Sequence, residues 1–265
     1  MKLLFADIDF FQAIFLRGLV SLPPLLILAF MTKTLLQKYS TKNQRLIIIR
    51  ILAEIGTTVT FLTALKHMPL ANVTAILQSL PLAITMAAAI FLGEPVGWRR
   101  WSAICVGFTG VLIIIRPGLA GFNSYSLLAL AAVILLTVRE ISTRQLDNKI
   151  PTVTVALSTT LGITAFAALM LIGTEWADIN FASWSLIIAA AAAVTVATLL
   201  SVVAMRTGDI GFVSPFRYTS LIGAIGLGIL LFGEWPDGIT LLGAAIIAFA
   251  GIYSLYREQI FNKNV

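Results

Sequence analysis

The most constraining feature of this chain is a series of long apolar segments that recur along its whole length. A helix rises about 1.5 Å per residue, so about 20 apolar residues cross the roughly 30 Å of hydrocarbon in a membrane. Nine segments come close to this length and are separated by short connections: 9–30, 45–66, 70–92, 97–115, 124–146, 151–174, 182–206, 210–232 and 238–257. They predict an all-α polytopic membrane protein with nine transmembrane helices.

The composition excludes several other classes of protein. Hydrophobic residues make up 59% of the chain and charged residues 11%, which leaves too few polar side chains to cover a water-soluble core. With one cysteine, Cys105, and one histidine, His67, the sequence holds no HExxH zinc motif, disulfide or thiolate cage. It also lacks the GxxxxGKS/T motif for ATP and the catalytic GxSxG motif. We therefore expect no cofactor, no bound metal and no catalytic residues.

The basic residues predict the orientation of the chain, because connections rich in Lys and Arg stay in the cytoplasm. One set of alternate connections carries twelve of the 18 basic residues and the opposite set carries three. The twelve are Lys33, Lys38, Lys42, Arg45, Arg99, Arg100, Arg139, Arg144, Lys149, Arg206, Arg257 and Lys263. We expect a cytoplasmic C-terminus and an external N-terminus in the inner (cytoplasmic) membrane. The net charge of +6 then reflects topology and requires no nucleic-acid partner.

The two halves of the chain resemble each other at a shift of 140 residues. The turn FLGEP matches LFGEWP, which places Gly93 and Glu94 on Gly233 and Glu234. The charge count puts these two turns on opposite sides of the membrane. Such inverted repeats are common in secondary transporters.

The repeat predicts how the chain is divided. We expect a first repeat over 1–118, a second over 119–258 and a cytoplasmic tail over 259–265. The segment at 124–146 has no counterpart in the first half. The nine helices therefore follow a ten-helix design from which the first helix is missing. Two explanations stay open: a start codon assigned too far downstream, or a true nine-helix protein.

The stretches that begin PLANV (69–118) and SPFRY (214–256), with their paired GE turns, resemble the two halves of an EamA-type carrier. These carriers belong to the drug/metabolite transporter superfamily. The resemblance implies ten helices with both termini inside. It also implies a substrate cavity between the halves, largely against the segments at 45–66, 70–92, 182–206 and 210–232. The run from Arg139 to Arg144 and SPFRYTSL are most similar to alphaproteobacterial branches that include riboflavin and S-adenosylmethionine importers.

Arg217 is the sharpest candidate for binding substrate. It follows Pro215, and proline frees backbone carbonyls at a level where broken helices of carriers bind solutes. Its guanidinium suits a carboxylate or phosphate, with Phe216 or Tyr218 stacked on a ring and Thr219 beside them. The alternative is that Arg217 reaches the cytoplasmic headgroups.

The first half offers weaker candidates. Thr74 and Gln78 are one turn apart on one helix face, and Gln78 aligns with Tyr218. They suit hydrogen bonds to substrate, and the alternative is polar contact between helices. Thr57 and Phe61 are similar but less distinctive.

The charged residues within predicted helices suggest ion coupling. Arg50 and Glu54 are spaced as an i,i+4 pair, and Glu54 is a candidate proton or cation carrier. The alternative is a structural pair near the cytoplasmic end. We expect Arg139 and Glu140 to serve as anchors at the end of their helix.

Together these features predict a secondary transporter that moves a small vitamin, nucleoside-like or amino-acid-like solute by alternating access. The alternatives are a truncated, inactive carrier and, with less support, a channel or a membrane enzyme. The expected partners are the solute and the lipid bilayer, without nucleic acid. A homodimer stays open.

Overall fold

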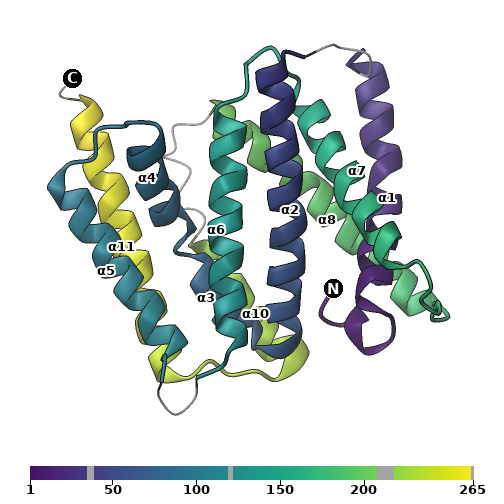
Figure 1. The fold of residues 1–265 in the computed structure, drawn as a ribbon. Coiled ribbons are helices and arrows are strands. Elements are labelled where there is room, and N and C mark those ends of the chain that lie inside the picture. Colours follow the sequence, from purple (N-terminus) through teal and green to yellow (C-terminus); the bar gives the residue numbers. More distant parts are fainter. Residues whose placement is uncertain (35–38, 119–121, 208–217, 264–265) are drawn as a thin grey trace. The chain divides into compact units, whose positions relative to one another are not determined.

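The computed structural model describes residues 1–34, 39–118, 122–207 and 218–263, and the regular elements in these ranges are all helices (Figure 1). They are η1 (Leu4–Ala6), α1 (Phe10–Met31), α2 (Thr41–His67), α3 (Leu70–Leu77), α4 (Leu80–Phe91), α5 (Trp98–Ile115), α6 (Tyr125–Arg144), α7 (Thr152–Met170), α8 (Phe181–Thr207), α10 (Thr219–Phe232) and α11 (Gly238–Lys263). Seven spans, with α3 and α4 counted as one, are long and apolar enough to cross a membrane, and two shorter apolar helices follow. Each predicted segment contains a helix, so the predicted all-α membrane fold is confirmed.

The segment at 70–92 differs from the expectation of one continuous helix, because it is divided between α3 and α4. At the division, the N–H of Gln78 is shared between the carbonyl oxygen of Thr74, four residues back, at 3.1 Å and that of Ala75, three residues back, at 3.2 Å. The N–H of Ser79 donates to the carbonyl oxygen of the residue three before it, at 3.1 Å. Such bonds tighten the chain into a 3-10 turn. Pro81 then lies in the first turn of α4, where its missing N–H leaves no hydrogen bond unmade.

The chain packs as two compact units, whose boundaries fall inside α2 and α6. Unit 1 comprises Met1–Gly56 and Val138–Thr207, and within it α1 packs against α7 and α8. The contact between α1 and α7 requires Gly18, because a Cβ at this position would collide with the side chain of Thr164. Close approach through a small residue is typical of helices packed in a membrane.

Unit 2 comprises Thr57–Thr137 and Gly208–Val265, and its largest contact joins α5 to α11. Gly110 and Gly243 let these two backbones approach, since a Cβ on either would lie 2.8 Å from the carbonyl oxygen of the other. Gly226 of α10 differs, because a Cβ there would meet nothing within 4 Å.

The turn between α10 and α11 stabilises helix starts in unit 2. Glu234 Oε2 accepts a hydrogen bond from the N–H of Leu70, the first residue of α3, at 2.9 Å. Asp237 Oδ1 accepts the N–H of Thr240 in the first turn of α11 at 2.9 Å, and its carboxylate also pairs with Arg116. Hydrogen bonds from Thr240 and then Arg116 lower the pKa of Asp237 from its ordinary 3.8 to about 2. The carboxylates of this turn therefore stabilise the fold.

Candidate functional site

The divided span in unit 2 brings together polar groups from the two halves of the chain. Gln78 lies at the end of α3 with only 4% of its surface exposed, and its Nε2 donates to the hydroxyl of Ser220 at 3.0 Å. Ser220 is the second residue of α10, so the bond joins the end of one helix to the start of another. A polar contact at a helix division is a typical place for a solute to bind in a carrier.

Tyr218 lies beside this junction in the sequence, immediately before α10. It is the N-cap residue of that helix, it is buried, and its ring packs where a Cβ on Gly251 of α11 would lie. Its neighbour Thr219 is exposed. Phe216 and Arg217, which the sequence also places here, lie outside the described residues.

The other predicted residues of unit 2 are less closely joined to the junction. Thr74 is half-buried on α3, one turn before Gln78, as the spacing predicts. Thr57 is buried on α2, and its hydroxyl has no hydrogen-bond partner among the described residues. Phe61, one turn further along α2, is half-buried. Sequence reasoning missed Ser220, although it lies only two residues after Tyr218 in the same polar run.

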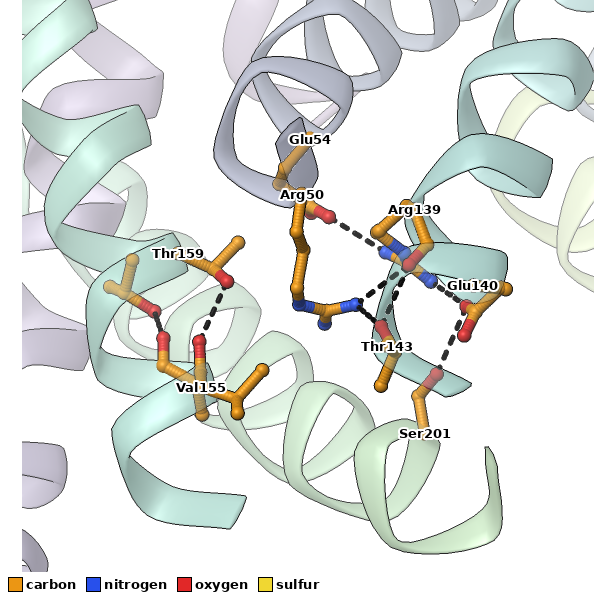
Figure 2. Close-up of polar contacts among 10 residues, drawn as sticks. Arg50, Glu54, Arg139, Glu140, Thr143, Val155, Thr159 and Ser201 are labelled. Atoms are coloured by element: carbon orange, nitrogen blue, oxygen red, sulfur yellow. Dashed lines mark hydrogen bonds and ion pairs between the residues drawn. The ribbon is translucent and has the colours of Figure 1, made fainter. Parts of the chain in front are cut away.

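A second polar site lies in unit 1, where charged side chains of α2 and α6 form a cluster (Figure 2). Arg139 Nη1 of α6 donates to Glu54 Oε2 of α2 at 2.8 Å, and Nη2 of the same guanidinium donates to Glu140. Ser201 of α8 donates its hydroxyl hydrogen to Glu140 Oε1 at 3.3 Å. The side chain of Glu140 is 1% exposed and that of Arg139 is 13% exposed. We call these residues, with Arg50 and Thr143, the charged cluster.

The cluster differs from the sequence expectations in two respects. The hydrogen bonds of Arg50 and Glu54 run across to α6 and not to each other, because Glu54 is held by Arg139. Arg139 and Glu140 also do not act as surface anchors. They face into unit 1, where each offsets the charge that the other buries.

Arg50 is among the most deeply buried members of the cluster, with 1% of its surface exposed. Its Nη1 donates to the hydroxyl of Thr143 and to the carbonyl oxygen of Arg139, the latter at 3.4 Å (Figure 2). Arg17 of α1 is also buried and interacts electrostatically with Glu54. The cluster and Arg17 thus place three arginines against two carboxylates, of which Arg17, Arg50 and Glu140 are buried and Arg139 and Glu54 are half-buried.

In the described ranges, no group of three or more His, Cys, Asp or Glu is placed to hold a metal ion. The polar side chains that the structure brings together are instead amides, hydroxyls, guanidiniums and carboxylates. Such groups bind polar and charged organic solutes by hydrogen bonds and ion pairs.

The helices define a multi-pass α-helical membrane protein, and buried polar and charged groups within membrane helices are typical of functional sites. The chain belongs to the EamA-like transporter family, which it matches twice, over residues 1–116 and 123–257. The predicted membership of this family, within the drug/metabolite transporter superfamily, is therefore confirmed. The two matched ranges correspond to the two halves of the sequence.

Two relatives and one solved structure place the chain more closely. It is 28% identical over 209 residues to a riboflavin transporter of Rhizobium johnstonii, and the aligned region covers 79% of this chain and 69% of that protein. It is 26% identical over 191 residues to an S-adenosylmethionine uptake transporter of Rickettsia bellii, and the aligned region covers 72% of this chain and 65% of that protein. The match spans about two thirds of the length of each relative. A crystal structure of a protein with 20% identity shares the fold, with a TM-score of 0.68 over 92% of this chain and 86% of that one.

Proposed function

We propose that this chain is a secondary transporter that moves a small organic metabolite across the cytoplasmic membrane by alternating access. The observation that carries the proposal is the match of both halves to a transporter family. Relatives named as transporters of riboflavin and of S-adenosylmethionine support a vitamin, nucleoside-like or amino-acid-like solute. The proposed orientation, with a cytoplasmic C-terminus, follows from the basic residues of the connections.

The proposed substrate contacts that the structure describes lie in unit 2, and Gln78 lies at its divided span. The amide of Gln78 is bonded to Ser220 and carries both donor and acceptor atoms, which suit contact with a polar solute. Because Gln78 and Tyr218 are equivalent in the two repeats, they supply related positions from both halves. The other residues that the sequence singles out complete the proposed set: Thr57, Phe61, Thr74, Phe216, Arg217 and Thr219.

We assign ion coupling to Glu54, with Arg50 one turn before it on α2. The Glu54 carboxylate is half-buried and bonded to Arg139, so its protonation would weaken a buried ion pair. A proton-driven carrier requires such a group, whose charge change alters the stability of one conformation relative to another.

Counterflow into proteoliposomes tests the proposed function directly. The purified full chain is reconstituted with unlabelled solute inside, and uptake of the labelled solute from outside is followed over time. The solutes are riboflavin, S-adenosylmethionine and a mixed amino-acid pool, each measured beside protein-free liposomes. We expect transient accumulation of one of them, since only a carrier exchanges internal for external solute without an energy source.

The outcomes separate the carrier from its alternatives. Uptake that equilibrates without an overshoot and does not saturate indicates a channel. Chemical conversion of the solute indicates an enzyme. A correctly folded chain that accumulates no solute from a broad metabolite panel contradicts the carrier proposal and supports a truncated, inactive protein.

A further inference from the structure

Arg50 of the charged cluster is buried but only partly bonded. Nη1 carries both of its hydrogen bonds, to Thr143 and to the carbonyl oxygen of Arg139. Nε and Nη2 are also buried, and neither has a hydrogen-bond partner among the described residues. An unbonded buried donor is costly, and it is costlier still when it carries part of a positive charge. A buried donor without a protein partner therefore calls for an explanation, and a bound ligand or an ordered water is a common one.

The two unbonded atoms are suitably placed for one kind of ligand. In the planar guanidinium group of arginine, the N–H bonds of Nε and Nη2 project from the same edge in a fixed fork. This edge matches the two oxygens of a carboxylate, which accept two parallel hydrogen bonds from it. Nη1, on the other side of the group, is already fixed by α6 and would hold the fork in place.

The charges of the cluster also favour an anion. Both of its carboxylates are bonded to Arg139, and Glu140 receives a further bond from Ser201. The oxygens that Arg50 contacts belong to a neutral hydroxyl and a backbone carbonyl (Figure 2). With Arg17 included, three arginines face two glutamates, which leaves one positive charge in excess. A monoanion offsets this excess, whereas a phosphate dianion reverses it.

We propose that the Nε and Nη2 edge of Arg50 binds the carboxylate group of the transported solute. This inference rests on the proposed function, because a side chain with 1% exposure meets a solute only in another conformation, and alternating access supplies more than one conformation. It narrows the substrate class to solutes that carry a carboxylate. Arg50 therefore acts on the solute, in addition to lying beside the ion-coupling group Glu54.

Thermal unfolding of the full chain in detergent measures anion binding at this site without requiring transport. The wild-type protein is titrated with sodium acetate, with neutral acetamide, with sodium chloride and with inorganic phosphate at matched ionic strength. Arg50→Gln removes the fork and the charge, whereas Arg50→Lys keeps the charge and removes the fork. Arg45→Gln is the matched control, because Arg45 lies on the same helix and is exposed.

We expect acetate to raise the melting temperature of the wild type and of Arg45→Gln more than the other three solutes do. In Arg50→Gln the apparent acetate affinity should fall at least tenfold, which corresponds to about 1.4 kcal/mol. The acetate affinity of Arg50→Lys should lie between those of the wild type and of Arg50→Gln. Arg50→Lys also supplies the measurement if Arg50→Gln does not fold. A larger response to phosphate than to acetate identifies a phosphate site and overturns the proposal.

Two further results would also overturn it: an acetate response that is equal in all variants, and no response specific to acetate in the wild type. Counterflow distinguishes this failure from failure of the proposed function. A wild type that exchanges riboflavin without an Arg50-dependent acetate response remains a carrier, but not one with this carboxylate site. An Arg50-dependent acetate response without exchange of any solute retains the site and contradicts the carrier.

Discussion

Replacing Arg139 by glutamine tests whether the charged cluster is a true structural unit of the membrane-embedded core. Arg139 donates to Glu54 at 2.8 Å and also bonds Glu140, whose side chain is 1% exposed. Arg139→Gln leaves both carboxylates without their cation. Removing one partner of a buried ion pair costs about 3–5 kcal/mol, because the remaining charge stays buried and uncompensated. Since the total stability of a folded domain is about 5–15 kcal/mol, this loss should be large.

A double variant makes the argument quantitative. Glu140→Gln removes one of the carboxylates that Arg139→Gln leaves unpaired, so the double variant should lose less stability than the sum of the single variants. We expect a coupling free energy of about 0.5–3 kcal/mol between the two positions. Arg45→Gln, on the exposed surface of α2, should change stability by less than about 0.5 kcal/mol.

The assay is thermal and denaturant unfolding of the purified variants in detergent, followed by tryptophan fluorescence. If Arg139 were an anchor at the headgroups, its replacement would cost little and would show no coupling to Glu140. An Arg139→Gln protein as stable as Arg45→Gln would therefore refute the reasoning. Strictly additive losses in the double variant would refute it too.

Three other variants test separate parts of the molecule. Gly110→Ala should destabilise the chain by about 1–3 kcal/mol relative to Gly226→Ala, because only the first forces a Cβ against a facing backbone oxygen; the melting temperatures compare them. The pKa of Asp237 is lowered mainly by its hydrogen bond from Thr240. The ionised carboxylate therefore stabilises the fold above its ordinary pKa of 3.8, and this contribution is lost as the pH falls towards about 2. Asp237→Asn should abolish this pH dependence of stability, which is measured by melting curves recorded at pH values across this range. Arg217→Ala should abolish counterflow while leaving membrane insertion intact; unchanged uptake kinetics would remove Arg217 from the proposed site.

The sequence was sufficient for the membrane fold and the family. The length of an apolar segment is a local property, so most of the nine predicted segments match helices or helix pairs to within a few residues. The largest differences lie in the last two segments, where the described part of 210–232 is helical from Thr219 and α11 extends to Lys263. The division of the span at 70–92 was not expected, although Pro81 lies close to it. A proline in the first helical turn is compatible with either a new helix or a continuous one, so the sequence alone does not distinguish them.

The polar contacts needed the tertiary structure, because their partners are far apart along the chain. Gln78 was a predicted candidate, but Ser220, its partner 142 residues away, was not. Spacing within one helix favoured a pair between Arg50 and Glu54, whereas Glu54 bonds Arg139, 85 residues away. Helical periodicity states which residues share a face of one helix. Which faces meet depends on how helices pack through small residues such as Gly18, and that packing decides which buried charges are paired and which edge of Arg50 is left for a ligand.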